Sequence, residues 1–343
     1  AQQDAVLFAP TTAWRVRWNM NTDTPLPPDE PTMPNPPEGA IINYYLKGAA
    51  NGPVTLEILD GAKVIRKYTS DDEVLRPNNA TTTLPLYWYR EPMVLSTAAG
   101  MHRFTWDVHL QPVDGVNRVG GPTLPIAAVP HNTVPAPTTP WANPGSYTVR
   151  LTVNGKSYTQ PIVVKADPRV KTPAATMQQV YTVSRAAWDG AVAARVAGDE
   201  ARALRTAIAA LLPKATGKVA EALTAFDKKL DALAGAVAAG GGRGRGQGGG
   251  GGGAGRAAGA GARAGAPAAA PAETLATASA ALSGVMNLLQ AADVTPTAVQ
   301  LKAMADAQAQ GTRVMAKWTA LSTTELAALN AQLTAGGLPA LKK

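Results

Sequence analysis

The fold changes class within the stretch Val164-Lys165-Ala166-Asp167-Pro168-Arg169-Val170-Lys171-Thr172-Pro173. Its first residues continue an alternating apolar and polar run that indicates a β-strand, and Asp167-Pro168 ends the run because proline lacks the amide hydrogen that a sheet needs. Thr172-Pro173 then gives a helix-start signal, a capping residue followed by proline at the first helical position. The stretch therefore predicts a β domain over residues 1–168 and a helical domain over residues 169–343.

Charge and composition change at the same boundary. Residues 1–168 carry 13 Lys+Arg against 14 Asp+Glu, whereas residues 169–343 carry 19 against 10. Only Trp188 and Trp318 of the seven tryptophans lie beyond residue 168, so the β half is expected to have the bulkier core. A neutral β half joined to a basic helical half is typical of a platform that carries an attachment device.

The first half contains two hairpin signals. Asp60-Gly61 and Asn154-Gly155 supply the positive φ angles that tight hairpins need, and alternating runs flank both. The flanking runs are 54–59, 63–68, 147–153 and 156–164. Further strand candidates are Trp14–Trp18, Ile41–Leu46 and His102–Leu110. About seven short strands, with proline-rich connections at 25–37 and 122–144, predict an immunoglobulin-like β-sandwich.

The second half predicts an antiparallel α-helical bundle. The expected helices are 174–197, 199–212, 214–239, 272–292, 296–320 and 323–335. Thr295-Pro296 repeats the helix-start signal, and Gly336-Gly337 gives a stop signal. Helices joined by short turns pack antiparallel. No membrane span is expected, because the longest uncharged helical run, 274–292, contains too many polar residues to face lipid.

A segment rich in Gly, Ala and Pro, residues 240–271, interrupts the helices. Its only charges are Arg243, Arg245, Arg256 and Arg263. One interpretation is a loop at the tip of a helical hairpin, and the other is a cationic arm that lies along an anionic surface or threads into a partner. Nucleic acid is not the expected partner, because no aromatic residues alternate with the arginines. The four arginines are the candidate partner-binding residues.

The histidines give no catalytic or metal signal. His102, His109 and His131 lack the paired spacing of zinc ligands. Asp107 and His109 share a strand face and could form an acid–base pair, but no nucleophile motif accompanies them, and a structural role is favoured. The absence of cysteine excludes disulfides, thiolate metal sites and cysteine nucleophiles.

Two groups of carboxylates have a similarly weak pattern. Asp71-Asp72-Glu73 lacks the alternating ligands of a calcium loop. Asp29, Glu30 and Glu38 resemble a glycosidase set only in composition, since nothing places two of them across a cleft. We therefore expect no enzyme activity, no metal, no cofactor and no small-molecule substrate.

A set of strings spread over almost the whole chain is similar to one known family. The strings are Leu7-Phe8-Ala9-Pro10, Asn21-Thr22-Asp23-Thr24-Pro25-Leu26-Pro27-Pro28, Gly52-Pro53-Val54-Thr55-Leu56-Glu57-Ile58, Ala99-Gly100-Met101-His102-Arg103-Phe104-Thr105-Trp106-Asp107, Pro144-Gly145-Ser146-Tyr147-Thr148-Val149-Arg150-Leu151, Asp167-Pro168-Arg169-Val170 and Leu326-Ala327-Ala328-Leu329-Asn330-Ala331-Gln332-Leu333. They resemble the region that follows the propeller in large exported BNR/sortilin-like β-propeller proteins. The resemblance implies a structural role, because glycosidase-like activity in that family would belong to the propeller, which this sequence lacks.

Export is the expected fate of the chain. Ala1-Gln2-Gln3-Asp4, a small residue followed by polar ones, is what signal peptidase leaves behind, and the resemblance implies the same. An accessory region that stands alone is expected to be a non-catalytic, periplasmic subunit, peripheral to the membrane, that docks on protein partners in a membrane complex and contacts the anionic membrane surface. It would be similar to the membrane-extrinsic polypeptides of the gemmatimonad photosynthetic reaction-centre–antenna complex.

Two alternatives remain open. The chain could be the C-terminal accessory domain of an exported BNR-propeller enzyme of the glycoside-hydrolase type. It could also be a carbohydrate-binding sandwich in which Trp14, Trp18, Trp88 or Trp141 stacks on sugars. Outward-facing rings favour the second alternative, whereas burial is the expected state of these rings in a sandwich.

Overall fold

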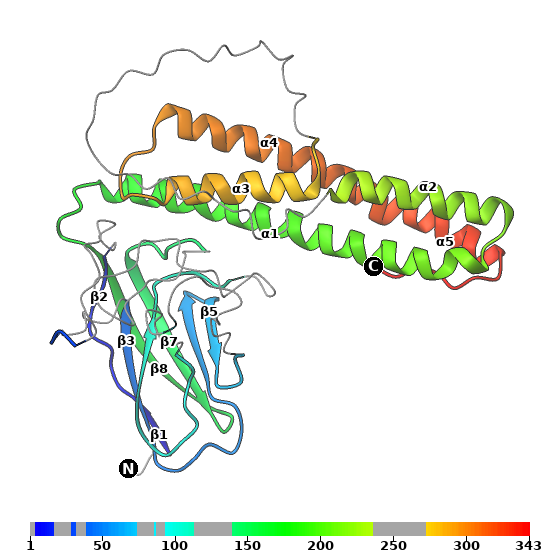
Figure 1. Cartoon of the computed structure of the whole chain (residues 1–343). Helices are drawn as coiled ribbons and strands as arrows, with labels where there is room; N and C mark the ends of the chain where they lie inside the picture. The colour runs from blue at the N-terminus through cyan, green and yellow to red at the C-terminus, as the bar shows by residue number, and fades with distance from the viewer. Residues whose placement is uncertain are drawn as a thin grey trace. The chain divides into compact units, whose positions relative to one another are not determined.

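The chain is a mixed α+β protein in the part that the structure, a computed structural model, describes (Figure 1). The described residues are 4–16, 29–31, 39–73, 86, 93–112, 139–235 and 272–343. Two compact units are present, Ala1–Trp188 with Met286–Gln300 and Asp189–Val285 with Leu301–Lys343. The change from strand to helix falls between Ala166 and Ala174. The compact units divide later, within the first helix, at Trp188.

The first unit contains the described strands. They are β1 (Ala5–Leu7), β2 (Ala13–Arg15), β3 (Ala40–Leu46), β4 (Thr55–Asp60), β5 (Lys63–Thr69), β6 (Gly100–Trp106), β7 (Gly145–Val153) and β8 (Lys156–Ala166). Among the described residues they form sheets of the order β1-β3-β6 and β2-β8-β7-β4-β5. The pairings are antiparallel except that of β2 with β8, which is parallel.

Both sheets contribute to one hydrophobic core. Alternate residues of each strand face inward, so Ile42 and Trp106 of one sheet and Leu56, Val149 and Ile162 of the other are buried in the same cluster. The period of two along each strand places these side chains on one face. The core therefore follows from the alternation visible in the sequence.

Both predicted hairpins are confirmed. β4 pairs with β5 and β7 pairs with β8, each antiparallel. Gly61 has a φ of 58°, and Asn154 and Gly155 have φ values of 49° and 76°. The turns thus use the left-handed region that glycine and asparagine tolerate.

Two other strands end earlier than the sequence predicts. β2 covers Ala13–Arg15 instead of extending to Trp18, and residues 17–28 lie outside the described part. β6 ends at Trp106, because Val108 takes a positive φ of 58° and His109 bridges to Trp141. A β-branched residue with positive φ is strained, and alternation alone does not reveal it.

The helices are α1 (Ala174–Leu211), α2 (Gly217–Ala234), α3 (Leu275–Leu289), α4 (Ala298–Ala320) and α5 (Leu326–Ala335). A short turn, η2 (Leu212–Lys214), follows α1, and a π-helical turn, η3 (Leu321–Glu325), joins α4 to α5. Every helix contributes to one core in the second unit. Buried members of this core include Ala194, Leu204, Leu223, Leu230, Leu275, Trp318 and Leu333.

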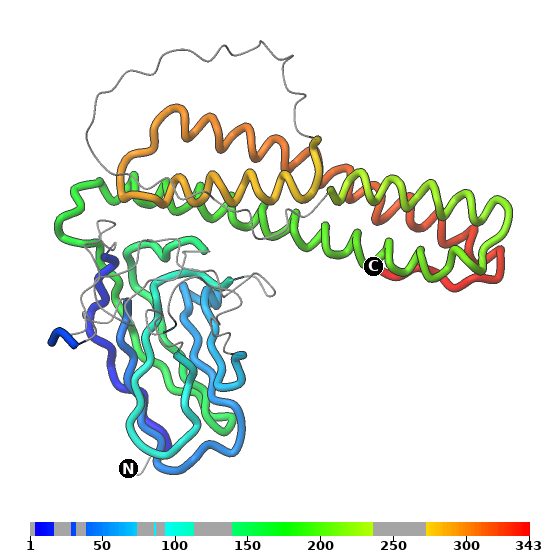
Figure 2. Tube along the Cα trace, viewed as in Figure 1, coloured from blue at the N-terminus to red at the C-terminus, as the bar shows by residue number. Residues whose placement is uncertain are grey.

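The break predicted at Gly198 is wrong. α1 runs from Ala174 to Leu211 and includes Gly198. The trace in Figure 2 shows this helix without a break. A Cβ there would lie 3.8 Å from Leu275 Cβ and 3.5 Å from Arg202 Nη1. The propensity cost of glycine in a helix, about 1 kcal/mol relative to alanine, is thus too small to end α1 at this position.

The helix ends differ from prediction at their N-termini. Thr172 donates its hydroxyl to the carbonyl oxygen of Asp293 instead of capping α1. α4 is capped by Thr297, whose Oγ1 accepts the Gln300 backbone N–H at 3.2 Å while Gln300 Oε1 accepts the Thr297 N–H at 2.8 Å. This reciprocal capping box replaces the Thr295-Pro296 start. The stop predicted at Gly336-Gly337 is confirmed, since α5 ends at Ala335.

Candidate functional site

The predicted partner-binding arginines lie outside the described residues. Arg243, Arg245, Arg256 and Arg263 belong to residues 236–271, between α2 and α3. That interval carries four arginines and no acidic residue. The structure describes the residues at its two ends, Gly235 and Ala272.

The two ends abut. Gly235, the residue after α2, has a φ of 70°, and a Cβ built on it would lie 2.3 Å from Thr274 Oγ1. Thr274 in turn caps α3: its Oγ1 accepts the Thr277 N–H at 3.1 Å, and Thr277 Oγ1 accepts the Thr274 N–H at 2.9 Å. The segment with the four arginines thus leaves and re-enters the helical unit at one place, which we call the stem (Gly235 and Glu273–Thr277).

Two cationic side chains of α4 lie beside Glu273, the acidic residue of the stem. Arg313 Nη2 lies 2.5 Å from Glu273 Oε1, and Lys317 Nζ lies 4.0 Å from Glu273 Oε2. The hydrogen bond from Arg313 lowers the pKa of Glu273, so the carboxylate is charged at neutral pH. One positive charge remains in excess beside the stem, on an exposed surface that salt screens.

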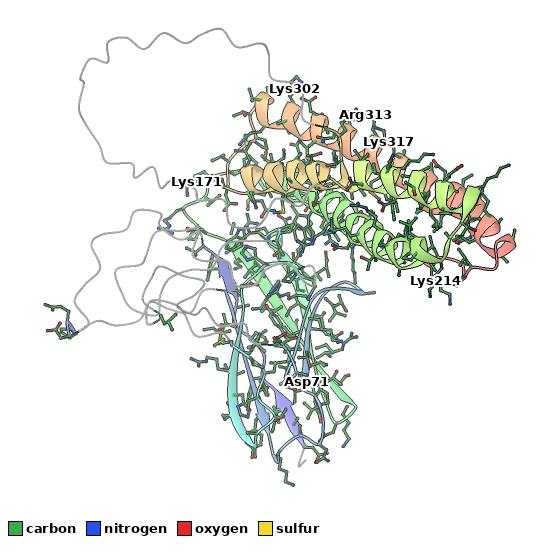
Figure 3. All side chains as sticks on the ribbon, turned by 45° about the vertical axis from the view of Figure 1, so that its right-hand side comes forward. Asp71, Lys171, Lys214, Lys302, Arg313 and Lys317 are labelled. Carbon is green, nitrogen blue, oxygen red and sulfur yellow. The ribbon has the colours of Figure 1, made fainter. Side chains whose placement is uncertain are left out.

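The positive side chains extend along α4. Lys302, Arg313 and Lys317 recur at helical spacing on its exposed side (Figure 3). Asp306 pairs with Lys302 at 2.7 Å. Among these residues the positive excess on α4 is therefore the same single charge that remains beside Glu273.

Elsewhere in the second unit, many cations are neutralised by nearby carboxylates. Arg205 bonds to Asp227 at 2.9 Å and also pairs with Asp231. Further pairs are Arg202–Asp199 at 2.5 Å, Lys229–Glu325 at 2.7 Å and Lys343–Glu200 at 3.2 Å. The described residues of the helical half carry 15 Lys+Arg against 10 Asp+Glu. The other four cations of this half, all arginines, lie in the sequence between residues 236 and 271.

A second polar cluster lies in the first unit, around Arg15 of β2. Arg15 Nη2 lies 2.6 Å from Asp293 Oδ1, and its Nη1 donates to the carbonyl oxygen of Ala142 at 3.1 Å. The guanidinium carbon is 5.9 Å from the ring centroid of Trp141, whose backbone N–H donates to Gln290 Oε1 at 2.9 Å. The side chains of Arg15 and Asp293 are only 6% and 9% exposed.

The cluster around Arg15 fastens the chain after α3 to β2 and to the loop before β7. It borders a pocket of about 20 Å³, lined also by Met177, Tyr181 and Val294. Such a volume holds about one water molecule, whereas pockets for small ligands span roughly 300–1,000 Å³. The arrangement is suited to joining elements rather than to binding a substrate.

The acid–base pair considered for Asp107 and His109 is not formed. His109 Nδ1 lies 2.8 Å from the backbone oxygen of Asp107, and the Asp107 carboxylate accepts the His109 backbone N–H at 3.0 Å. The imidazole packs on Trp141, with ring centroids 4.1 Å apart. His109 therefore packs on Trp141 and bonds to the backbone of Asp107 in place of the acid–base pair.

The other candidate groups have local partners or lie outside the described part. Asp72 accepts the Thr69 backbone N–H at 3.0 Å, and Asp71 bonds to Ser70 at 3.4 Å, as expected for a turn. His131 and Glu38 are not described, whereas Asp29 and Glu30 are exposed. Within the described ranges, no three His, Asp or Glu side chains are placed to share a metal ion.

The tryptophans separate into two classes. Trp106 is fully buried and Trp141 is 8% exposed, so neither presents a ring to a ligand. Trp14 is 45% exposed, against the expectation of burial, because Ala13 and Arg15 take the inward positions of β2. Trp18 and Trp88 lie outside the described residues.

Sequence reasoning missed Arg15 and Asp293. An arginine in a strand is expected to face solvent. The alternation of Trp14, Val16 and Trp18 predicts that these residues face the core and that Arg15 faces outward, which is the opposite of the observed register. Asp293 lies in a connection whose partner cannot be deduced from local pattern. Only the tertiary structure brings the two together.

The comparisons with known proteins add no relative. No protein-family model matches the chain, and no curated protein or solved structure is detectably similar to it. Of the helices in the described ranges, none is both long and apolar enough to cross a bilayer.

Proposed function

We propose that this chain is a non-catalytic subunit that docks on a larger, membrane-bound assembly through the positively charged insertion of its helical half. The observation that carries the proposal is the stem, where Gly235 abuts Thr274 and Arg313 and Lys317 share Glu273. Because the two ends abut at the stem, the segment that contains the four arginines is attached to the helical half at one place. Oriented positive charge next to an anionic partner increases association and selects the partner.

For the first half we propose an immunoglobulin-like β-sandwich. In the described part, the order β1-β3-β6 fits strands A, B and E of that fold, and β8-β7-β4-β5 fits strands G, F, C and C′. Near the start of β7, the Tyr147 hydroxyl donates to the Asn143 carbonyl oxygen at 2.6 Å, four residues upstream. This bond fits the tyrosine corner found at the start of strand F.

For the second half we propose an antiparallel bundle. The shared core of α1, α2, α4 and α5 supports it, together with the short connections η2 and η3. In this scheme the sandwich serves as a spacer or second contact, and the bundle supplies the attachment.

The resemblance to the region after the propeller in exported BNR/sortilin-like proteins determines where to look for the partner. We propose an exported, periplasmic protein at the membrane surface. The assembly to test first is a photosynthetic reaction-centre–antenna complex of the gemmatimonad type.

Retention on native membranes of the source organism tests the proposal. Binding is measured at about 50 mM and about 500 mM salt, followed by cross-linking and identification of the bound subunit. We expect retention at low salt, loss at high salt and cross-links to one defined complex. A chain that remains unbound at both salt concentrations would contradict the proposal.

A control separates a protein partner from the lipid surface. Vesicles that contain anionic lipid replace the native membranes under the same conditions. Equal retention on vesicles and native membranes would show that lipid charge alone accounts for binding and would overturn the proposed protein partner.

A further inference from the structure

The described sheet of the order β2-β8-β7-β4-β5 carries an exposed tryptophan, Trp14, on its edge strand β2. Trp14 lies opposite Lys165 in the parallel pairing of β2 with β8, and Lys165 Nζ is 5.7 Å from the ring centroid. Both side chains are exposed, whereas Ala13 and Arg15 on either side of Trp14 are buried. A single exposed ring is common on protein surfaces, but this ring shares its face with the exposed side chain of Val163, so the apolar area of the face is open to a ligand.

The same face continues with small apolar and hydroxyl side chains. Along β8, Val163 and Pro161 follow Lys165 at alternate positions, and both are exposed. Their partners on β7 are Ser146 opposite Val163 and Thr148 opposite Pro161. From β2 across β8 to β7 the face spans two strand spacings, about 10 Å, which is the scale of a short oligosaccharide.

We propose that this face, formed by Trp14, Lys165, Val163, Ser146 and Thr148, binds an acidic polysaccharide. The ring face of Trp14 stacks on the apolar face of a sugar ring, and the Lys165 ammonium pairs with the carboxylate of a uronic acid unit. The hydroxyls of Ser146 and Thr148 exchange hydrogen bonds with sugar hydroxyls. Charge complementarity therefore selects an acidic chain over a neutral one.

The size of the face argues against a protein as its main occupant. A stable protein interface covers about 800 Å² on each partner, with aromatic anchors in desolvated pockets and few lysines in its centre. Here one aromatic ring lies on an open sheet face beside a lysine, hydroxyl groups and only two exposed apolar side chains of β8, Val163 and Pro161. These groups recognise a hydroxylated, flat ligand.

The probe is polygalacturonate, with dextran as the neutral polysaccharide, in affinity gel electrophoresis of the full chain. All variants are made in a background where Arg243, Arg245, Arg256 and Arg263 are replaced by Gln, because those arginines attract any polyanion. We expect retardation by polygalacturonate in this background and weaker retardation by dextran. Trp14→Ala is expected to weaken both interactions by about tenfold.

Lys165→Gln and a matched control variant test whether the ammonium of Lys165 gives the preference for the acidic polysaccharide. Lys165→Gln is expected to remove the preference for polygalacturonate and leave the weak dextran binding unchanged. Lys63→Gln, which removes another exposed lysine from β5, is expected to change neither. Urea unfolding of each variant shows whether the fold is intact.

The results that would overturn the saccharide site differ from the results that would overturn docking through the arginines. If polygalacturonate retards the wild-type chain only while the four arginines are present, or retards Trp14→Ala as strongly as its background, the saccharide site does not exist, and docking through the arginines is unaffected. Retention on native membranes is measured with Trp14→Ala made in the wild-type chain. If this variant binds native membranes more weakly while polysaccharide binding in the arginine-free background is unchanged, the face is a protein contact, and the inference is overturned.

Discussion

Arg15 on β2 and Asp293 after α3 form an ion pair at 2.6 Å although 278 positions separate them in the sequence. Arg15 also bonds to the carbonyl oxygen of Ala142, and the backbone oxygen of Asp293 accepts the Thr172 hydroxyl. Four stretches of chain that are distant in sequence therefore meet at one buried pair. This cluster explains why residues 286–300 belong to the same compact unit as the strands.

The first prediction concerns this ion pair. Arg15→Ala removes the guanidinium that pairs with the buried Asp293 carboxylate, which is expected to lower the free energy of unfolding by about 3–5 kcal/mol. Urea unfolding measures the change. The Arg15→Met, Asp293→Leu double variant removes both charges and is expected to lose much less. If the double variant is as unstable as Arg15→Ala, the pair does not act as a coupled unit.

The second prediction concerns the stem. Gly235→Ala is expected to destabilise the chain by about 1–3 kcal/mol, because Gly235 has a φ of 70° and ψ of 162° and a Cβ would lie 2.3 Å from Thr274 Oγ1. Gly284→Ala is the matched control, since a Cβ at this helical glycine meets nothing within 4 Å. That control is expected to be neutral or to stabilise α3 by up to about 1 kcal/mol. Equal effects of the two substitutions in thermal unfolding would show that the ends of the insertion do not abut.

The third prediction is a stabilising one in α1. Gly198→Ala places a methyl group at ordinary contact distance from Leu275 Cβ, 3.8 Å, within an uninterrupted helix. The substitution is expected to raise the free energy of unfolding by about 1 kcal/mol, because alanine has the higher helix propensity. Gly190→Ala serves as the contrast, since its Cβ would lie 3.1 Å from Leu282 Cδ1 and force that side chain to move. A loss of stability in Gly198→Ala would contradict this prediction, because it would show that α1 does not accommodate a methyl group at this position.

The fourth prediction is a pH dependence. The side-chain hydrogen bond from Arg169 lowers the pKa of Asp167 from its ordinary value of 3.8 to about 2. A carboxylate with a depressed pKa in the folded state stabilises it above the unfolded-state pKa, and this contribution is lost as the pH falls through the folded-state value. We therefore expect the stability that depends on Asp167 to decline between about pH 4 and pH 2.

Asp167→Asn isolates this contribution. The free energy of unfolding of the variant and of the wild type is measured by urea titration from pH 6 to about pH 2. The difference between the two is expected to shrink as the pH falls over the lower part of that range. A difference that stays constant with pH would show that Asp167 titrates alike in both states.

Local patterns in the sequence predict the elements whose causes are local. The hairpins at Gly61 and at Asn154-Gly155 appear where two-residue turn signals lie between alternating runs. The stop at Gly336 needs no distant partner either. In contrast, Gly198 is a helix breaker by propensity, and contact with Leu275, 77 positions further along, lies beyond any local window.

The register of β2 shows the same limit at the level of a site. Alternation predicts that Trp14 faces the core, yet the core accepts Ala13 and the paired Arg15, and Trp14 faces outward. A distant carboxylate, Asp293, makes burial of an arginine acceptable in this strand. The candidate partner-binding arginines stay a prediction from composition, which shows that residues 236–271 contain four arginines and no acidic residue.

Retention on native membranes, with and without the insertion's charges, tests the central proposal most directly. The test variant replaces Arg243, Arg245, Arg256 and Arg263 by Gln, and the control variant replaces four exposed cations of the β half by Gln. The control positions are Lys63, Lys67, Arg103 and Lys156. We predict that the test variant loses at least about tenfold in membrane affinity at low salt while the control binds as the wild type does. Equal retention of all three proteins, or equal loss in both variants, would contradict docking through this segment.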